Sequence, residues 1–511
     1  MAQNGKTEFD ALIVGYGPVG VAAANALAQR GWTVAAIDRM TDVYPLPRAV
    51  LFDGEIMRLY QELGMSEALL AQTEQNLGAE FIDATGKRIQ GFDIPPGTVG
   101  AHNWPDGNFF HQPTFERTLR QYASNNENVT TFLGYEAASP QSAENTVSIE
   151  IKPVDGGPAT TLTAPYLLAA DGAASPVRKA LDIQFNSLGY DCDWLVVDVF
   201  LDKEVTLPTI AQQVCDPNRI ATFVPIVGNR RRWEFRLNEG ETREEMLDED
   251  KIYDLLAPWV KRDEATIERA AVYTFHAATA DKWRDRHIFL MGDAAHQTPP
   301  FLGQGMCAGM RDVANLVWKL DFVKRGLAPA SLLATYQEER DPHAMDLVDH
   351  AVAVGKLMDS IADAQVTGNW PENMDAIYGG SRGFPRLHSG VLAKGTEEDS
   401  GKIFGHLFPQ ATVDLDGQGP QQLDDCYSGN FAVISAKDLS GDISDEHKTF
   451  LDRIGAKVLT VPEEARLSDQ LDLILAFNDA VIVRPDHYIF SVVNADHPLT
   501  EQLTQLQSHF N

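Results

Sequence analysis

A glycine-rich turn near the N-terminus has the spacing of a phosphate-binding loop. It reads Gly15-Tyr16-Gly17-Pro18-Val19-Gly20 and follows a short apolar run. The first glycine permits a tight turn, the second lets the backbone approach a pyrophosphate, and the third lets the following helix pack on the strand. The N–H groups at the start of that helix are then available to the phosphates. Asp38 follows at the distance expected for an acid that accepts a ribose hydroxyl, so the motif predicts a bound dinucleotide.

A second motif, in the middle of the chain, indicates which dinucleotide is bound. Gly292-Asp293 follows the apolar run 287–291 and precedes another glycine turn, Gly303-Gln304-Gly305. An aspartate here can accept a hydrogen bond from a ribityl hydroxyl, and the next helix directs its positive dipole end at the carbonyl edge of a flavin. The alternative is that Asp293 only caps a helix. Together the two motifs predict FAD.

The elements that position these motifs indicate an α/β fold. The first two strands and the helix between them form a βαβ opening. Two later apolar strands lead into Asp171-Gly172 and Gly292-Asp293, which places each aspartate at the carboxyl end of a strand. The strands are expected at 11–14, 33–37, 165–170 and 287–291, and the helices at 19–30, 54–63, 309–324 and 332–352.

Two segments, 77–100 and 186–275, have a different pattern. They contain alternating apolar and polar stretches and predict a mostly antiparallel sheet that forms a substrate domain over the cofactor. The FAD-binding domain then comprises residues 1–76, 101–185 and 276–367.

The C-terminal part of the chain is expected to form a separate small domain. Residues 368–401 are rich in Gly, Pro and polar residues and predict a linker. Residues 402–511 have the alternation of apolar strands and helices of a small α/β domain, with strands expected at 431–435, 457–461 and 480–483.

The composition restricts the partners and the compartment. The 511 residues carry a formal net charge of −31, which repels nucleic acid and anionic membranes. The 4 cysteines are widely spaced and form no Cys-x-x-Cys pair, which argues against a disulfide framework and fits a reducing cytoplasm. The sequence shows no signal peptide, no membrane span and no metal-binding motif.

Three motifs in this chain resemble those of the single-component FAD-dependent aromatic hydroxylases, which include phenol hydroxylase and p-hydroxybenzoate hydroxylase. They are the glycine turn, residues 171–178 and residues 292–312, and the resemblance covers roughly residues 8–350. Within the family the resemblance is strongest to the 3-(3-hydroxyphenyl)propionate hydroxylases, through residues 194–198, 231–235 and 303–312.

The resemblance implies a fold and a reaction. The fold is a Rossmann-like FAD-binding domain with a β-sheet substrate domain and a C-terminal thioredoxin-like domain, with which a homodimer is compatible. In the implied reaction NADH or NADPH reduces the flavin, O2 adds to give a flavin hydroperoxide, and one oxygen atom passes to a small phenolic, carboxylated aromatic substrate. Oxygenation of a polycyclic aromatic or polyketide is an alternative. A flavin-binding sensor or sequestering protein without hydroxylase activity is another.

The resemblance also implies which residues bind FAD. Each belongs to a glycine turn, follows a strand of the FAD-binding domain, or lies in a Pro-Arg-Ala or His-Gln-Pro segment. They are Gly15, Gly17, Pro18, Val19, Gly20, Asp38, Arg39, Arg48, Gln112, Asp171, Gly172, Gly292, Asp293, Pro300, Gly303, Gly305 and Met306.

Three residues are implied to take part in catalysis, and each has a structural alternative. Asp53 would lie near the substrate hydroxyl or cap the helix that begins at Gly54. Tyr273 would bond the phenolic oxygen or pack within a strand. Arg48 would contact the flavin or lie on the surface. The substrate pocket is expected to contain Trp233, Phe235, Tyr273 and Pro299.

Some positions differ from the family pattern. Close relatives carry an arginine two residues before the pocket tyrosine, where this chain has Ala271, and an asparagine where it has Cys307. The first difference bears on substrate recognition, and Cys307 is expected to be a packing residue. The run Arg230-Arg231-Arg232 would attract an anionic substrate or be a solvated face paired with Glu239, Glu241 and Glu244. His296 is expected to be structural.

Overall fold

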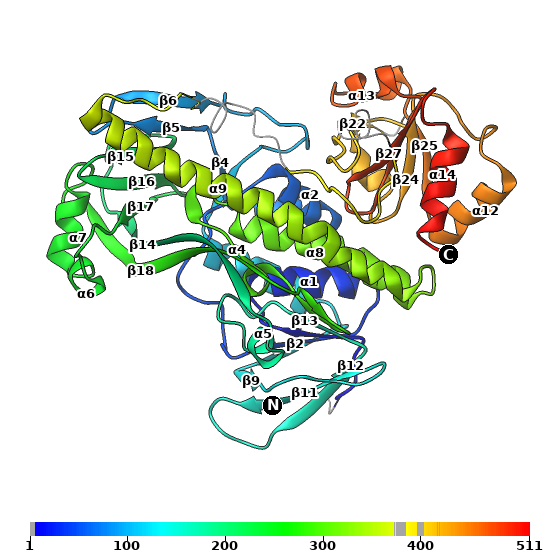
Figure 1. Ribbon diagram of the computed structural model, residues 1–511, viewed down its shortest axis with the longest axis horizontal. Helices are drawn as coiled ribbons and strands as arrows, with labels where there is room; N and C mark the ends of the chain where they lie inside the picture. The colour runs from blue at the N-terminus through cyan, green and yellow to red at the C-terminus, as the bar shows by residue number, and fades with distance from the viewer. Residues whose placement is uncertain (1–5, 373, 375–384, 396–402, 416, 418) are drawn as a thin grey trace.

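The computed structural model describes residues 6–372, 374, 385–395, 403–415, 417 and 419–511. Figure 1 shows the FAD-binding part in the centre, the large insert sheet to the left and the C-terminal part to the upper right. The long helix α9 (Thr335–Thr367) starts beside α8 (Gly305–Lys324) and ends over the insert sheet. It therefore connects the two larger parts.

The centre of the molecule is a largely parallel sheet in the order β19-β20-β13-β1-β2-β8. The predicted βαβ opening is confirmed as β1, α1 and β2, because β1 pairs in parallel with both β2 and β13. Helices α1 and α8 pack against each other beside this sheet. The elements are β1 (Ala11–Val14), α1 (Pro18–Gln29), β2 (Val34–Asp38), β8 (Val129–Leu133), β13 (Tyr166–Ala169), β19 (Arg284–Asp285) and β20 (Ile288–Leu290).

The two predicted insert segments meet in a single sheet, in the order β21-β18-β14-β17-β16-β15-β5-β6. All neighbours are antiparallel except β15 and β5, which pair in parallel and join the two segments. Two long strands, β14 and β18, connect this sheet to the flavin turns. The strands are β5 (Gly78–Ile82), β6 (Arg88–Asp93), β14 (Phe185–Leu201), β15 (Ala211–Asp216), β16 (Arg219–Pro225), β17 (Arg230–Arg236), β18 (Ala265–Ala280) and β21 (His296–Gln297).

Two small sheets were not expected from the sequence. One contains β9 (Tyr135–Ala137), β10 (Gln141–Ser142), β11 (Val147–Pro153) and β12 (Thr160–Ala164). The other contains β3 (Leu51–Phe52), β4 (Thr73–Gln75) and β7 (Asn108–Phe110). Most of their strands are short, whereas β11 has a clear period of two that the sequence analysis overlooked.

Helix α9 is longer than the expected 332–352. A 3-10 helix, η3 (Ala330–Ala334), precedes it, and Pro342 lies inside it without ending it. The helix stops at Gly368, whose φ of 80° gives the left-handed C-cap that glycine favours. The predicted linker lies partly outside the described residues. Its described part 385–395 is packed rather than extended, with Leu387 and Val391 fully buried.

The C-terminal part contains the three predicted strands. β24 (Ala432–Ser435), α12 (Asp445–Ile454) and β25 (Lys457–Thr460) form a parallel βαβ unit, and β26 (Ala480–Val483) and β27 (Ile489–Val493) continue the sheet as an antiparallel hairpin. α13 (Asp472–Phe477) and α14 (Leu499–Ser508) complete this part. Its description as thioredoxin-like stays a prediction, as do the domain boundaries.

The remaining elements are short or surround the sites described below. The helices are α2 (Gly54–Glu62), α3 (Ser66–Leu70), α4 (Gln112–Ser124), α5 (Pro176–Ala180), α6 (Arg243–Met246), α7 (Glu249–Leu256), η1 (Gly292–Ala294), η2 (Pro300–Leu302), η4 (Leu423–Cys426) and η5 (Glu463–Ala465). The short strands β22 (Thr412–Val413) and β23 (Gln421–Gln422) pair with each other.

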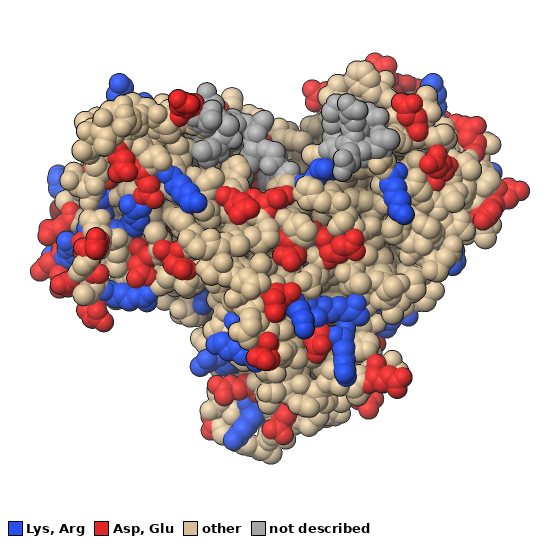
Figure 2. Space-filling model, in the orientation of Figure 1, with Lys and Arg blue, Asp and Glu red and all other residues tan. Residues whose placement is uncertain are grey.

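Acidic and basic side chains are intermixed on the face shown in Figure 2. The excess of negative charge on that face is thus spread over several elements. Among the described residues, no helix is long and apolar enough to cross a membrane.

Candidate flavin and substrate site

The first glycine turn has the geometry that a pyrophosphate requires. Gly15 has a φ of +93°, and a Cβ there would lie 2.3 Å from the carbonyl oxygen of Ala170. A Cβ on Gly20 would lie 1.9 Å from the carbonyl oxygen of Gly15. Gly17 is different, because a Cβ there would meet nothing within 4 Å. The turn is therefore closed on the strand side and open at Gly17, where a phosphate group would approach.

Helix α1 begins at this turn without a capping side chain. Pro18 occupies its first turn, no acidic residue lies there, and Gly17 is the N-cap. The free N–H groups and the dipole of α1 therefore suit an anionic ligand. Asp38 accepts hydrogen bonds from the N–H groups of Tyr16 (2.7 Å) and Met40 (2.8 Å), so it also shapes the turn. Arg39 is exposed beside it.

The second motif is held against the first by a buried aspartate. Asp312 accepts a hydrogen bond from the Gly292 N–H (2.8 Å) and contacts His296 Nε2 (2.8 Å) and Arg340 Nε (2.9 Å). A Cβ on Gly292 would lie 3.2 Å from Val19 Cγ2, so the two distant motifs touch. His296 thus has the structural role expected of it.

Asp293 lies in the second of these turns, in η1. The residue is exposed to solvent. Burial among the surrounding atoms nevertheless raises the pKa of its carboxyl, and the charges of Arg48 and His296 oppose this rise. Within the described part of the chain no hydrogen bond reaches this carboxylate. An acceptor so placed suits a ligand hydroxyl, as the predicted ribityl contact requires.

The loop that carries Arg48 is held from two sides. Gln112 Oε1 accepts hydrogen bonds from the N–H groups of Arg48 and Ala49, both at 2.8 Å. Arg232 donates to the carbonyl oxygens of Pro47 and Arg48, also at 2.8 Å. The Arg48 side chain is exposed and lies over the ring of Tyr44 at 4.8 Å. The structure thus gives Gln112 the role of positioning Arg48.

Helix α8 presents a second uncapped N-terminus. It follows Gly303, whose φ of 64° is left-handed, and its N-cap Gln304 makes no capping hydrogen bond. A Cβ on Gly305 would meet nothing within 4 Å, so Gly305 and Met306 are open to a ligand. Pro299 and Pro300 form the adjoining turn at η2. This arrangement fits the carbonyl edge of a flavin ring.

Asp171 and Gly172 form a tight connection after β13. Asp171 accepts hydrogen bonds from Ser175 Oγ (2.6 Å) and the Val177 N–H (3.0 Å), which closes the start of α5. Gly172 has a φ of +81°. Arg178 Nη1 then donates to the carbonyl oxygens of Ala173 (3.1 Å) and Ala294 (3.3 Å), which ties this connection to the Asp293 turn.

Asp53 has the structural surroundings of the helix-cap alternative. Its carboxylate accepts hydrogen bonds from the Ile56 N–H (3.1 Å) and from Arg311 Nη2 (2.7 Å). Burial alone would raise the pKa of Asp53, but the Arg311 charge and the hydrogen bonds to this carboxylate together lower it. Arg311 also pairs with Glu55 (2.6 Å), so the start of α2 and helix α8 are joined by a buried ion network.

The insert sheet places Tyr273 and the two pocket candidates Trp233 and Phe235 on opposite faces. Side chains alternate along a strand, and the pairings put Tyr273 with Trp194 and Asp198 on the face towards the Arg48 loop. Trp233 and Phe235 lie on the other face, fully buried against a separate apolar cluster. The expectation that they line the substrate pocket is therefore corrected.

The arginine run has partners other than those expected. Arg230 pairs with Glu268 (3.0 Å), and Arg232 is buried in a pair with Asp198 (2.7 Å). Arg269 also contacts Asp198 (3.0 Å) and donates to the Pro47 carbonyl oxygen. The sequence analysis missed this cluster. A signal was present, because Arg232 and Glu234 alternate with Trp233 and Phe235, so the two charged residues lie on one face of the strand and the two aromatic residues on the other.

Comparison with known proteins agrees with this geometry. Residues 8–351 match the FAD binding domain family, and residues 405–509 match the HcaD C-terminal domain. A probable NADH-specific resorcinol 4-hydroxylase of Rhodococcus jostii is 32% identical over 96% of this chain and 92% of its own. A 3-(3-hydroxy-phenyl)propionate/3-hydroxycinnamic acid hydroxylase of Burkholderia cenocepacia is 29% identical over 97% of this chain and 96% of its own.

Solved structures share the fold along the whole chain. The flavin-dependent monooxygenase PieE, in complex with FAD and substrate, has a TM-score of 0.82 at 20% identity, covering 98% of this chain and 99% of its own. Aklavinone-11 hydroxylase, with FAD and aklavinone, has a TM-score of 0.80 at 21% identity, covering 99% and 100%.

The chain belongs to the FAD-binding family of flavoprotein hydroxylases. It is an FAD-dependent aromatic-ring monooxygenase that takes its reducing equivalents from NAD(P)H. The glycine turns, the two uncapped helices and the Asp293 carboxylate fit the phosphates, ring and ribityl chain of the cofactor.

Proposed function

We propose that the enzyme hydroxylates a small phenol that carries a second polar substituent in the meta position, with NADH as the preferred reductant. The full-length similarity to a resorcinol hydroxylase and to 3-(3-hydroxy-phenyl)propionate hydroxylases supports this substrate class, because both names describe such phenols. The observation that carries the proposal is the pair Tyr273 and Arg269 on the sheet face towards the Arg48 loop.

Arg269 prepares the Tyr273 hydroxyl for a phenolic substrate. Its Nη1 lies 3.4 Å from Tyr273 Oη, and its guanidinium lies over the Tyr273 ring at 5.5 Å. Because arginine only donates, the tyrosine O–H is left to donate to a substrate oxygen. Such a bond stabilises a developing phenolate, which makes the ring more nucleophilic. Arg269 thereby supplies a guanidinium on the face where the relatives' arginine is replaced by Ala271.

The other residues of the site bind and orient. FAD, when bound, supplies the reduction by NAD(P)H and the activation of O2. Arg48 and Asp293 would bind it, and the α8 N-terminus would support negative charge on its ring. The buried Asp198–Arg232 pair keeps the Arg48 loop rigid while this occurs.

The test is NADH and NADPH oxidation by the purified holoenzyme with resorcinol or 3-(3-hydroxyphenyl)propionate, in isotopically labelled oxygen. We expect faster oxidation of NADH and one labelled oxygen atom in the product. Tyr273→Phe should retain FAD but lower kcat/KM for the phenol by about tenfold to a hundredfold, the value of a hydrogen bond to a charged group.

Three outcomes would contradict the proposal. Oxidation that yields only peroxide with both phenols would mean that neither is held for oxygen transfer. An unchanged kcat/KM in Tyr273→Phe would mean that the Tyr273 hydroxyl does not bond the substrate. If no small phenol stimulates NADH oxidation, the search moves to larger aromatic substrates.

We also propose that the enzyme is a cytoplasmic homodimer. Leu473 and Phe477 on α13 are each 74% exposed, and such apolar side chains favour an interface. Light scattering of the purified protein would give the oligomeric state, and a monomer at all concentrations would contradict it.

A further inference from the structure

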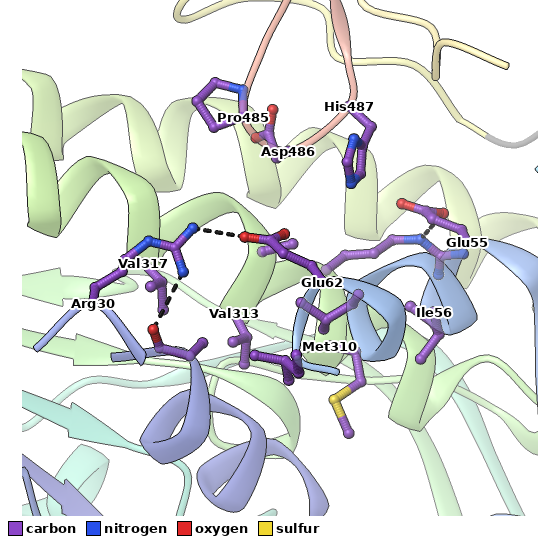
Figure 3. A pocket seen from close by; sticks show the side chains of 15 residues that line it. Arg30, Glu55, Ile56, Glu62, Met310, Val313, Val317, Pro485, Asp486 and His487 are labelled. Carbon is purple, nitrogen blue, oxygen red and sulfur yellow. Dashed lines mark hydrogen bonds and ion pairs between the residues drawn. The ribbon is translucent and has the colours of Figure 1, made fainter. Parts of the chain in front are cut away.

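A buried turn of the C-terminal part packs against the FAD-binding part. The turn Arg484–Pro485–Asp486–His487 joins β26 to β27, and Figure 3 shows its last three residues above helices α2 and α8. Pro485, Asp486 and His487 line a cavity whose wall also includes Glu55 and Arg311. Tyr488 follows the turn and is 3% exposed.

Ion pairs fix this turn between α8 and α9. Arg484 contacts Glu339 (2.7 Å) and Asp486 (2.7 Å), and Glu339 also pairs with Lys319 (2.7 Å). All of these side chains are buried, so each charge depends on its partners. Trp318 Nε1 adds a hydrogen bond to Asp486 (3.2 Å). The position of Tyr488 is therefore set by α9 and by α8, the helix that begins at the second glycine turn.

One hydrogen-bond chain runs from Tyr488 to the start of α8. The Tyr488 hydroxyl lies 3.3 Å from Glu55 Oε1. Glu55 Oε2 accepts from Arg311 Nε (2.6 Å), and Arg311 Nη1 donates to Gln304 Oε1 (2.9 Å). Gln304 is the N-cap residue of α8, next to Gly305. The chain thus ends at the backbone expected to face the flavin ring.

A second chain runs from the same hydroxyl to the Asp293 turn. Tyr488 Oη lies 3.0 Å from His343 Nε2, and His343 Nδ1 lies 2.7 Å from Arg340 Nη1. Arg340 Nε donates to Asp312 (2.9 Å), which accepts from the Gly292 N–H (2.8 Å). Both flavin turns are therefore within a few buried hydrogen bonds of one phenol.

The proton positions in these chains follow from the arginines. Arg340 only donates, so His343 Nδ1 accepts and Nε2 carries the proton of the neutral ring. His343 Nε2–H then donates to Tyr488, and Tyr488 O–H donates to Glu55. Each bond has one donor and one acceptor, so a single assignment of the protons satisfies the whole network.

We propose that Tyr488 is a positioning residue through which the C-terminal domain sets the two flavin turns. It contacts neither flavin nor substrate. Its hydroxyl holds Glu55 and His343 in place, and these hold the start of α8 and the Gly292–Asp293 turn. The inference rests on the flavin placement given above and assigns a role to the C-terminal domain that the reaction itself does not require.

The experiment replaces one buried hydroxyl in the full-length protein. Tyr488→Phe removes the shared hydrogen-bonding group and keeps the ring. Tyr427→Phe is the matched control, because Tyr427 is as buried and lies in the same domain. It bonds Asp424 (2.8 Å) and His487 (2.9 Å), and these contacts lead to Arg58 of α2 rather than to Glu55 or His343. The readouts are the FAD dissociation constant of the apoprotein, its melting temperature, and the reduction potential of the bound flavin.

We expect Tyr488→Phe to weaken FAD binding by about fivefold to tenfold and to shift the flavin potential to more negative values, because the α8 N-terminus is no longer held at the ring. In Tyr427→Phe the FAD dissociation constant and the flavin reduction potential should stay within error of the wild-type values. Equal effects in both variants, unchanged FAD affinity in Tyr488→Phe, or weaker binding without a change in potential would overturn the proposal. Failure of the wild type to bind FAD would instead refute the flavin placement.

Discussion

Two aspartates beside the flavin turns have opposite surroundings. Asp53 is 3% exposed and accepts hydrogen bonds from Ile56 and Arg311, so both of its carboxylate oxygens have partners within the protein. Asp293 is reached by solvent, and no described residue bonds its carboxylate. Loss of one partner of a buried ion pair destabilises the fold, whereas a solvent-accessible acceptor is available to a ligand. The same residue type thus has two roles, which the sequence alone did not separate.

The two aspartates should respond differently to substitution. Asp293→Ala should raise the FAD dissociation constant by about tenfold to a hundredfold, since it removes a charged hydrogen-bond acceptor, without lowering the stability of the apoprotein. Asp53→Asn should lower apoprotein stability by about 3 kcal/mol or more, because Arg311 loses a buried partner. Fluorescence titration with FAD and urea unfolding measure the two effects. A loss of stability in Asp293→Ala and of affinity alone in Asp53→Asn would reverse the assignment.

Helix α4 connects the two parts of the flavin site along one face. Gln112 binds the Arg48 loop at its start, and Arg120 Nη2 donates to the Tyr16 carbonyl oxygen of the glycine turn (2.6 Å). Glu116 lies one turn from each and pairs with Arg120 (2.9 Å). This spacing of four residues puts all three side chains on one face. The helix therefore fixes the distance between turn and loop.

Glu116 makes the stability of this region depend on pH. Burial raises the pKa of its carboxyl to about 7, although Arg120 and Gln112 act to lower it. In the unfolded chain the pKa is about 4.3, so between these values the folded state binds more protons and stability falls as pH rises. Glu116→Gln should remove this fall and stabilise the protein at pH 8 by up to about 3 kcal/mol, with little effect near pH 4. The exposed Glu127→Gln is the control.

Urea unfolding of both variants and the wild type at several pH values measures the effect. If Glu116→Gln and Glu127→Gln follow the same pH profile as the wild type, Glu116 is already ionised in the folded protein at pH 5. That result would contradict the role of burial at this position.

At the scale of the whole molecule, local patterns predicted more than long-range pairings. The βαβ opening, the glycine turns and the antiparallel insert sheet could be predicted because glycine spacing and hydrophobic periodicity are visible in short stretches of sequence. The partner of Arg232 could not be predicted, because Asp198 lies on another strand and only the register of the sheet brings the two residues together. The sequence also did not reveal the contact of Tyr488 with Glu55, which joins residues 433 positions apart in the chain. The extension of α9 past 352 was missed, although Val354, Leu357 and Ile361 continue the helical apolar spacing and the helix packs on β15.

The net charge of −31 should influence how the whole enzyme meets its reductant. NADH is an anion, and a surface with acidic groups on several elements repels it over distances that salt screens, about 10 Å at 0.1 M ionic strength. We expect kcat/KM for NADH to rise as sodium chloride is increased from about 10 to 150 mM, the range over which screening becomes effective. The kcat/KM of a neutral phenol such as resorcinol should change little, because it feels no net field. Steady-state kinetics at several salt concentrations separate the two. A fall with salt for NADH would show that basic groups such as Arg48 dominate its approach, since local attraction is then being screened.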